Sequence, residues 1–147
     1  MTIAEGVLIE AREWIGTPYL HQASVKGVGT DCLGLLRGIW RAQYGAEPEA
    51  VPPYTEDWAE PDHREVLLES ACRWLTIKEL AQVAVGDVLL FRMRDGSIAK
   101  HLGVQSRIGT HPQFIHAYTG HGVIESSLSS PWQRRIAARF CFPEGAR

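Results

Sequence analysis

The stretch Thr30-Asp31-Cys32-Leu33-Gly34-Leu35-Leu36 decides the fold, because it places a cysteine in the first turn of an amphipathic helix. Apolar side chains recur with helical spacing from Cys32 to Trp40, and Gly45 ends the pattern. Cys32 therefore lies at the open end of the buried stripe, where we expect the helix dipole to lower the pKa of the thiol and favour the nucleophilic thiolate. The competing interpretation is an inert core residue, since free cysteine is among the most buried residue types.

The composition predicts one domain, residues 1–147. The chain has 147 residues, 45% of them hydrophobic, which is enough for one core. A formal net charge of -2 with interspersed signs leaves no polyanion-binding stripe, so we expect no nucleic acid partner. No apolar run approaches the roughly 18 residues of a membrane span, so we expect no membrane insertion.

The cysteines and the first residues predict where the chain is made. Three cysteines without Cys-x-x-Cys spacing indicate neither a disulfide framework nor a thiolate metal site, and we expect no cofactor. The segment from Met1 to Gly6 lacks the basic and apolar regions of a signal peptide. We therefore expect synthesis in the cytoplasm without a signal peptide.

The pattern along the chain predicts helices first and strands afterwards. Helical spacing covers residues 3–15, 32–44 and 63–75, and residues 46–62, rich in proline and acidic side chains, predict an extended surface excursion. From residue 88 the period becomes two. This order is typical of an α+β domain whose N-terminal helices pack on a C-terminal antiparallel sheet of about five to six strands. We expect strands at 88–93, 100–106, 113–118, 123–128 and 135–142, with Arg134, Arg135 and Arg139 on the solvent face of the last.

Two histidines fall inside expected strands and are candidates for catalysis. If the strands that carry His101 and His116 form a hairpin across Gly109 with an even loop, the two side chains share a face, directly opposite or one diagonal apart. Either histidine taken alone is more often a structural residue. Together with Cys32 they supply a nucleophile, a base and a group that orients the base.

A metal site is the competing use of the histidines. His111, His116 and His121 are spaced five residues apart. This spacing suits no single helix face, and His111 and His121 fall in expected turns beside Pro112 and Gly122. We therefore favour the thiol site and expect no bound metal.

Several motifs in the same order resemble the NlpC-type cell-wall peptidases. Gly16-Thr17-Pro18-Tyr19 is similar to the opening segment of that family, and Asp31-Cys32-Leu33-Gly34-Leu35 resembles its nucleophile motif. Val85-Gly86-Asp87-Val88-Leu89-Leu90-Phe91 resembles the strand that opens its sheet. His101-Leu102-Gly103-Val104 and Phe114-Ile115-His116-Ala117 resemble the strands of its base and orienting residue. The resemblance covers residue 3 to about residue 128 and implies a compact papain-like fold.

The resemblance also implies an activity and roles for five residues. It implies hydrolysis of a peptidoglycan stem peptide, typically between D-glutamate and the following diamino acid. Cys32 would attack, His101 would act as base and then acid, and His116 would orient His101. Asp31 would face the free amine of the stem peptide, and Tyr19 would lie near the acyl oxygen. The backbone amide of Cys32, at a helix start, is a candidate oxyanion donor.

A narrower resemblance implies a route to the cell wall. The segment from Tyr19 to Cys32, with Pro52-Pro53-Tyr54 and Asp57-Trp58, is similar to short peptidases encoded with phage tails and gene transfer agents. The implied partners are tail-tip or hub proteins of a phage-like particle, which would carry the enzyme to the periplasm or cell wall. A catalytically silent tail or hub subunit with the same fold, and a related thiol amidase or acyltransferase, are the alternatives.

Overall fold

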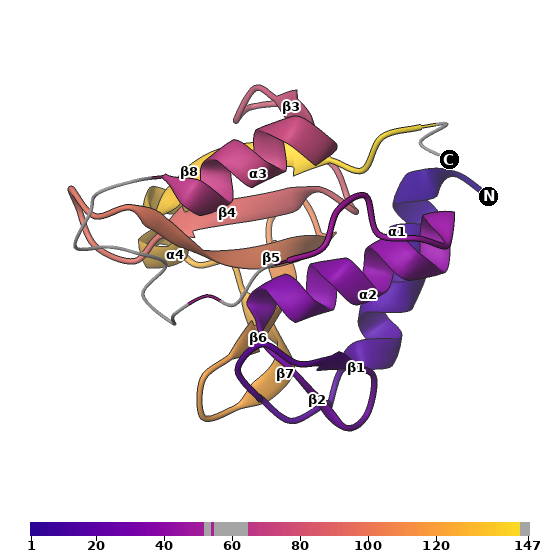
Figure 1. Cartoon of the computed structure of the whole chain (residues 1–147). Coiled ribbons are helices and arrows are strands. Elements are labelled where there is room, and N and C mark those ends of the chain that lie inside the picture. Colours follow the sequence, from indigo (N-terminus) through magenta and orange to yellow (C-terminus); the bar gives the residue numbers. More distant parts are fainter. Residues whose placement is uncertain (52–53, 55–64, 145–147) are drawn as a thin grey trace.

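The computed structural model describes residues 1–51, 54 and 65–144 and confirms an α+β fold with N-terminal helices and an antiparallel sheet. Figure 1 shows α1 and α2 gathered at one end of the sheet and α3 at the other. The helices are α1 (Ile3–Trp14), α2 (Cys32–Tyr44), α3 (Val66–Trp74) and α4 (Ser130–Arg134); the strands are β1 (Ser24–Val25), β2 (Gly29–Thr30), β3 (Thr76–Lys78), β4 (Val88–Arg92), β5 (Ala99–Arg107), β6 (Gln113–Tyr118), β7 (Gly122–Ser127) and β8 (Ile136–Cys141).

The main sheet has six antiparallel strands in the order β3-β8-β4-β5-β6-β7. Strands β4 to β7 form a meander, and β8 returns along the other side of β4. The expected strand count and direction are therefore confirmed. The sequence did not indicate the β1-β2 hairpin, β3 or α4, which are all very short.

The segment between α2 and α3 is only partly described. Residues 46–51 and Tyr54 belong to no helix or strand, as expected for a surface excursion. The remainder of that expectation, including the Asp57-Trp58 motif, lies outside the described residues. The expected helix over 63–75 is observed from Val66 to Trp74, and residues 63–64 lie outside the described part as well.

The sheet carries apolar side chains on both faces. On one face α1, α2 and α3 pack through a large core cluster that includes Trp14, Leu35 and Ile39. Gly38 lets α1 and α2 approach closely, because a Cβ there would lie 2.0 Å from the Trp14 ring. The opposite face carries a smaller cluster to which α4 contributes Trp132; its buried members are Leu89, Phe91, Phe114 and Leu128.

A buried ion pair on β8 contradicts the expectation that Arg139 lies on a solvent face. Arg139 is 3% exposed, and its guanidinium donates to the Asp87 carboxylate at 2.8 Å and to Gln105 Oε1 at 2.7 Å. The reason is that the segment between β3 and β4 covers this face of β8, with the Leu80 carbonyl accepting from Arg139 Nε at 3.1 Å and Asp87 accepting from the same guanidinium. Arg134 and Arg135 are exposed.

Over the described residues, no helix is long and apolar enough to cross a membrane.

Candidate active site

Asp31 fixes the start of α2 and thereby the position of Cys32. The backbone of Asp31 is extended, and its Oδ1 accepts a hydrogen bond from the Gly34 amide at 2.7 Å. Cys32 is therefore the first helical residue, with its amide ahead of the first hydrogen-bonded turn. Gly34 is required here, because a Cβ would lie 1.9 Å from the Ala23 carbonyl oxygen.

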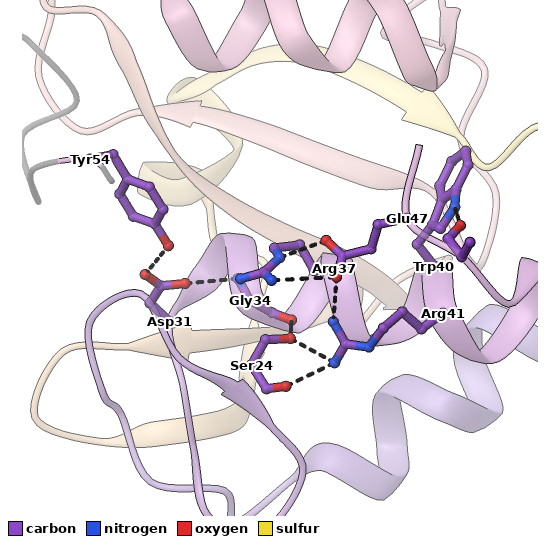
Figure 2. A network of polar contacts seen from close by, with 9 residues as sticks. Ser24, Asp31, Gly34, Arg37, Trp40, Arg41, Glu47 and Tyr54 are labelled. Atoms are coloured by element: carbon purple, nitrogen blue, oxygen red, sulfur yellow. Dashed lines mark hydrogen bonds and ion pairs between the residues drawn. The ribbon is translucent and has the colours of Figure 1, made fainter. Parts of the chain in front are cut away.

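The second carboxylate oxygen of Asp31 is also engaged. It accepts from the Tyr54 hydroxyl (Figure 2). It also accepts from the Gln22 amide at 2.7 Å and lies 3.7 Å from His21 Nδ1. The Tyr54 carbonyl in turn accepts from the Gln22 side chain at 2.6 Å and lies 2.9 Å from His21 Nε2. Tyr54 and the loop around His21 are thus joined above the start of α2, and Asp31 is 2% exposed.

The Cys32 sulfur lies against the part of β5 that carries His101. The thiol contacts the Lys100 carbonyl oxygen at 4.0 Å, and the Leu102 amide also points toward the sulfur. These two groups flank His101 in the chain. The structure therefore brings the candidate nucleophile and the candidate base to the same point of the strand.

Burial contradicts the expectation that Cys32 has a lowered pKa. Cys32 is 8% exposed, and burial, with the Asp31 charge, raises the pKa of its thiol to about 12. Amides of the helix start and of Leu102 oppose this rise without overcoming it. In the free protein the sulfur is therefore a neutral thiol, which needs a base at the moment of attack.

The two candidate histidines form a hydrogen-bonded pair, although the even loop that was expected to align them is not observed. The loop 108–112 between β5 and β6 has five residues, and the irregularity between Gln105 and Arg107 restores the shared face. Val104 of β5 pairs with Ile115 of β6, so His101 and His116 have the parity of one face, a diagonal apart. His101 Nε2 lies 2.7 Å from His116 Nδ1. Gly103 makes room for the pair, because a Cβ there would lie 2.8 Å from the Phe114 ring and 3.4 Å from His116 Cβ.

Ser126 on β7 extends the pair into a chain of three groups. His116 Nε2 lies 2.8 Å from Ser126 Oγ. If the Nε2 proton of His116 is donated to Ser126, His116 Nδ1 accepts from His101 Nε2 and His101 Nδ1 carries no proton. This tautomer is the one in which His101 can act as a base toward Cys32.

Both imidazoles are held neutral by their surroundings. Burial lowers the pKa of His101 to about 3, with a further contribution from His116. Burial likewise lowers the pKa of His116 to about 4, with His121 contributing. A neutral imidazole and a neutral thiol are the protonation states from which a base can take the thiol proton during nucleophilic attack.

The neutral pair predicts an acid-sensitive fold. Above pH about 6.5, the ordinary histidine pKa, both rings are neutral in the folded and unfolded chains. As the pH falls from there toward 3–4, the unfolded chain binds protons that the folded chain refuses. We expect the free energy of unfolding to fall by up to about 1.4 kcal/mol per pH unit for each ring. Urea denaturation at several pH values between 7.5 and 5 measures this slope.

The matched control is the His101→Gln/His116→Gln double variant. Its own stability differs, so the slopes rather than the absolute values are compared. The wild-type slope between pH 6.5 and 5 should exceed that of the variant. Equal slopes would show that the pair does not resist protonation.

Tyr19 is placed beside the nucleophile segment by the backbone. It bridges Thr30, and the Leu20 amide donates to the Thr30 carbonyl at 3.0 Å. The side chain is half-buried and packs against the main core cluster.

Three neighbours of the site were not identified from the sequence as functional. Ser126, Tyr54 and Trp132 all reach it through long-range packing. The Ser-Ser-Pro-Trp stretch at 129–132 does carry the signal of a helix start, with Pro131 at its first turn.

The surroundings of the site contain a cavity and, in the part of the chain that the structure describes, no metal-binding cluster. Within the described ranges, no three histidine, cysteine or acidic side chains lie together so as to hold a metal ion. A cavity of about 750 Å³ opens beside Leu33 and Leu102, the chain neighbours of Cys32 and His101, and extends between α2 and α3.

A thiol at a helix start, against the strand that carries one member of a hydrogen-bonded imidazole pair, supplies the groups that papain-like cysteine hydrolases use. The model of the NlpC/P60 family matches residues 16–140. The chain therefore belongs to the NlpC/P60 family, which confirms the family resemblance of its motifs.

Two curated relatives come from Escherichia coli strain K12. The protein named murein DD-endopeptidase MepS/murein LD-carboxypeptidase is 32% identical over 130 residues, covering 88% of this chain and 57% of the relative. A probable endopeptidase NlpC is 26% identical over 138 residues, covering 92% of this chain and 76% of the relative. The chain thus spans little more than half the length of the first of these relatives.

Solved structures of the family share the fold. A Bacillus cereus NlpC/P60 protein aligns with a TM-score of 0.63 at 19% identity, over 95% of this chain and 40% of that one. A Staphylococcus aureus NLP/P60 protein aligns with a TM-score of 0.62 at 16% identity, over 95% of this chain and 41% of that one.

Proposed function

We propose that this chain is a cysteine peptidase that hydrolyses peptidoglycan stem peptides, at the bond between D-glutamate and the diamino acid. The observation that carries the proposal is the hydrogen-bonded set of His101, His116 and Ser126 together with the Cys32 thiol, which contacts the backbone on either side of His101. Family membership and the names of the relatives support peptidoglycan as the substrate.

The first half of the reaction forms a thioester. Cys32 Sγ attacks the carbonyl carbon of the scissile amide while its proton moves to His101 Nδ1. The Cys32 amide stabilises the negative oxygen, since it lies at the positive end of α2. His101 then gives the proton to the departing amine, and the C–N bond breaks.

Water completes the cycle. It attacks the thioester carbon and loses a proton to His101, the C–S bond breaks, and the proton returns to sulfur. His116 orients the ring of His101 throughout: in the tautomer that this mechanism requires, His101 Nε2–H donates a hydrogen bond to His116 Nδ1 and leaves His101 Nδ1 unprotonated.

Asp31 and Tyr19 are proposed to contact the substrate. An ammonium group of the stem peptide would bind Asp31 Oδ2 in place of the Tyr54 hydroxyl, so binding requires Tyr54 to move. Tyr19, held beside Thr30, is proposed to lie near the acyl oxygen.

Digestion of purified sacculi and of a defined stem tetrapeptide tests the proposal. Mass spectrometry of the products identifies the bond. Fragments ending in D-glutamate would support the proposal, and cleavage elsewhere would overturn the bond assignment. No cleavage of either substrate would favour the catalytically silent subunit.

His101→Gln tests the base. Glutamine keeps polarity and similar size but cannot take the Cys32 proton, so we expect kcat/KM on the tetrapeptide to fall by roughly 10²–10⁴. KM should change little. A variant with more than about a tenth of the wild-type kcat would contradict the role of His101.

We further propose delivery by a phage-like tail. The support is the resemblance of the Tyr19–Cys32 segment and of the Pro52-Pro53-Tyr54 and Asp57-Trp58 motifs to tail-encoded peptidases, and the contacts of Tyr54 with His21 and Gln22. Mass spectrometry of tailed particles purified from the source organism tests it. Absence of the chain from such particles would contradict delivery by a tail and leave the peptidase proposal standing.

A further inference from the structure

Trp132 on α4 lies against both catalytic candidates from the face of the sheet that α4 covers. Its ring centroid is 5.7 Å from that of His101 and 5.4 Å from that of His116. It also contacts Phe91 and Phe114, each at 5.1 Å between centroids. One indole thus bridges the two imidazoles and the apolar residues beneath them.

The remaining aromatic neighbours complete an enclosure around the pair. Phe114 lies 4.2 Å from His116 at an interplanar angle of 33°, and Phe91 lies 5.8 Å from His101. Tyr118 contacts both imidazoles, at 5.8 Å from His101 and 5.2 Å from His116. Phe91, Phe114 and Tyr118 come from β4 and β6 of the sheet, whereas Trp132 comes from a separate five-residue helix.

Several hydrogen bonds fix α4 on the sheet. Gln133 donates its side-chain amide to the Leu128 carbonyl at 2.8 Å, and the Leu128 amide donates to Pro112 at 2.8 Å. The Arg92 amide of β4 donates to the Arg135 carbonyl at 2.8 Å. The Arg135 guanidinium lies 5.6 Å from the centre of the indole. Trp132 therefore has a defined position rather than that of a surface side chain.

We propose that Trp132 is a positioning residue of this site, which locks the ring planes of His101 and His116 and excludes water from them. The proposal rests on the proposed peptidase function. It assigns α4 a task that neither the sequence motifs nor the relatives' names indicate.

The physical argument is that a hydrogen bond between two imidazoles directs a proton only while both rings keep their orientation. Rings packed on several sides cannot rotate, so the 2.7 Å hydrogen bond between His101 Nε2 and His116 Nδ1 is kept and His101 Nδ1 stays available for the thiol proton in the required tautomer. Removal of the indole would open one side to water. A hydrated imidazole is protonated more easily, and a protonated His101 cannot accept the Cys32 proton.

Other titratable groups also lie near the histidine pair, but none of them shields the imidazoles from water as the indole does. Cys32, with Asp31 beside it, contacts the backbone on either side of His101 from α2. Tyr118 contacts both rings from β6, and His121 stacks on Tyr118 at 5.4 Å. Arg135 contacts the indole, and its positive charge disfavours a second cation there. The indole therefore acts on the imidazoles by exclusion of water and not as a partner for an imidazolium.

The test compares Trp132→Ala, Trp132→Phe and Trp132→Leu in the full chain, with Arg134→Ala on the exposed face of the same helix as matched control. Nitrogen NMR of the imidazoles as a function of pH reports tautomers and pKa values without any need for activity. The pH profile of kcat/KM on the stem tetrapeptide is the second readout. Circular dichroism and Tm identify a variant that fails to fold, and the two conservative variants then carry the test.

In Trp132→Ala we expect the pKa of His101 or His116 to rise by at least about one unit, with loss of the single tautomer. The acid limb of kcat/KM should rise with it, and kcat at pH 7 should fall about tenfold with little change in KM. Trp132→Phe should retain most of both properties. Arg134→Ala should match the wild type.

Unchanged tautomers and pKa values in a folded Trp132→Ala or Trp132→Leu variant would overturn the proposal. Because the NMR readout does not depend on turnover, wild-type protein that fails to cleave peptidoglycan would refute the peptidase function alone. A changed tautomer in such a protein would still support the positioning role.

Discussion

Replacement of Cys32 by alanine should abolish hydrolysis of stem peptides while leaving the fold intact. The variant lacks the only proposed nucleophile, and a site that loses a nucleophile acting in concert with its base loses roughly 10⁴-fold or more in kcat/KM. Alanine is the best helix former and keeps the amide at the start of α2, where the Asp31 cap remains. Mass spectrometry of the tetrapeptide digest measures the loss, and circular dichroism checks the fold.

The other cysteines provide the controls for this experiment. Cys72 is exposed on α3 and Cys141 lies at the end of β8, and neither adjoins the histidine pair. Cys72→Ala and Cys141→Ala should keep the wild-type rate. Hydrolysis that persists in Cys32→Ala would refute the nucleophile, and loss of activity in a folded Cys72→Ala variant would point to a different thiol.

The fold and the core of the candidate site could be predicted because their signals are local. The 3.6-residue period placed Cys32 at a helix start, and the two-residue period placed His101 and His116 on strands, whereas their shared face depends on the irregularity between Gln105 and Arg107. Both patterns depend only on neighbouring residues. The family resemblance joined them across the chain, and the match to the family over residues 16–140 confirms it.

The rest of the site depends on packing that no local pattern contains. Ser126 reaches His116 from β7, and Trp132 reaches both imidazoles from a five-residue helix. The pKa of the Cys32 thiol could not be predicted from the local pattern either. A helix dipole favours the thiolate, but the burial of Cys32 acts more strongly in the opposite direction, and burial is a property of the assembled core.

The second large effect concerns the fold, and we expect Arg139→Ala to destabilise the protein by about 3–5 kcal/mol. The alternation around Arg139 is typical of a strand with a solvent face, yet β8 lies inside the sheet. The Arg139 guanidinium donates hydrogen bonds to Asp87, which is 1% exposed, to Gln105 and to the Leu80 carbonyl. Alanine removes one donor from the buried Asp87 carboxylate, which keeps Lys78 and the Ala84 amide, takes the arginine donor from the buried Gln105 Oε1, and opens a cavity. Urea denaturation at pH 7 measures the loss.

Two further variants separate the buried ion pair from a general effect of removing an arginine. Arg134→Ala, on the exposed face of α4, should change stability by less than about 0.5 kcal/mol. Asp87→Asn combined with Arg139→Met removes both charges, although Lys78 still lies 2.7 Å from the side chain at position 87. Asp87→Asn alone leaves the Arg139 charge without Asp87, and Arg139→Met alone leaves the Asp87 carboxylate without Arg139. The double variant does neither, so its loss of stability should be smaller than the sum of the two single losses by at least about 1 kcal/mol. Additive losses would mean that Arg139 stabilises the sheet by packing and that its charge is balanced elsewhere.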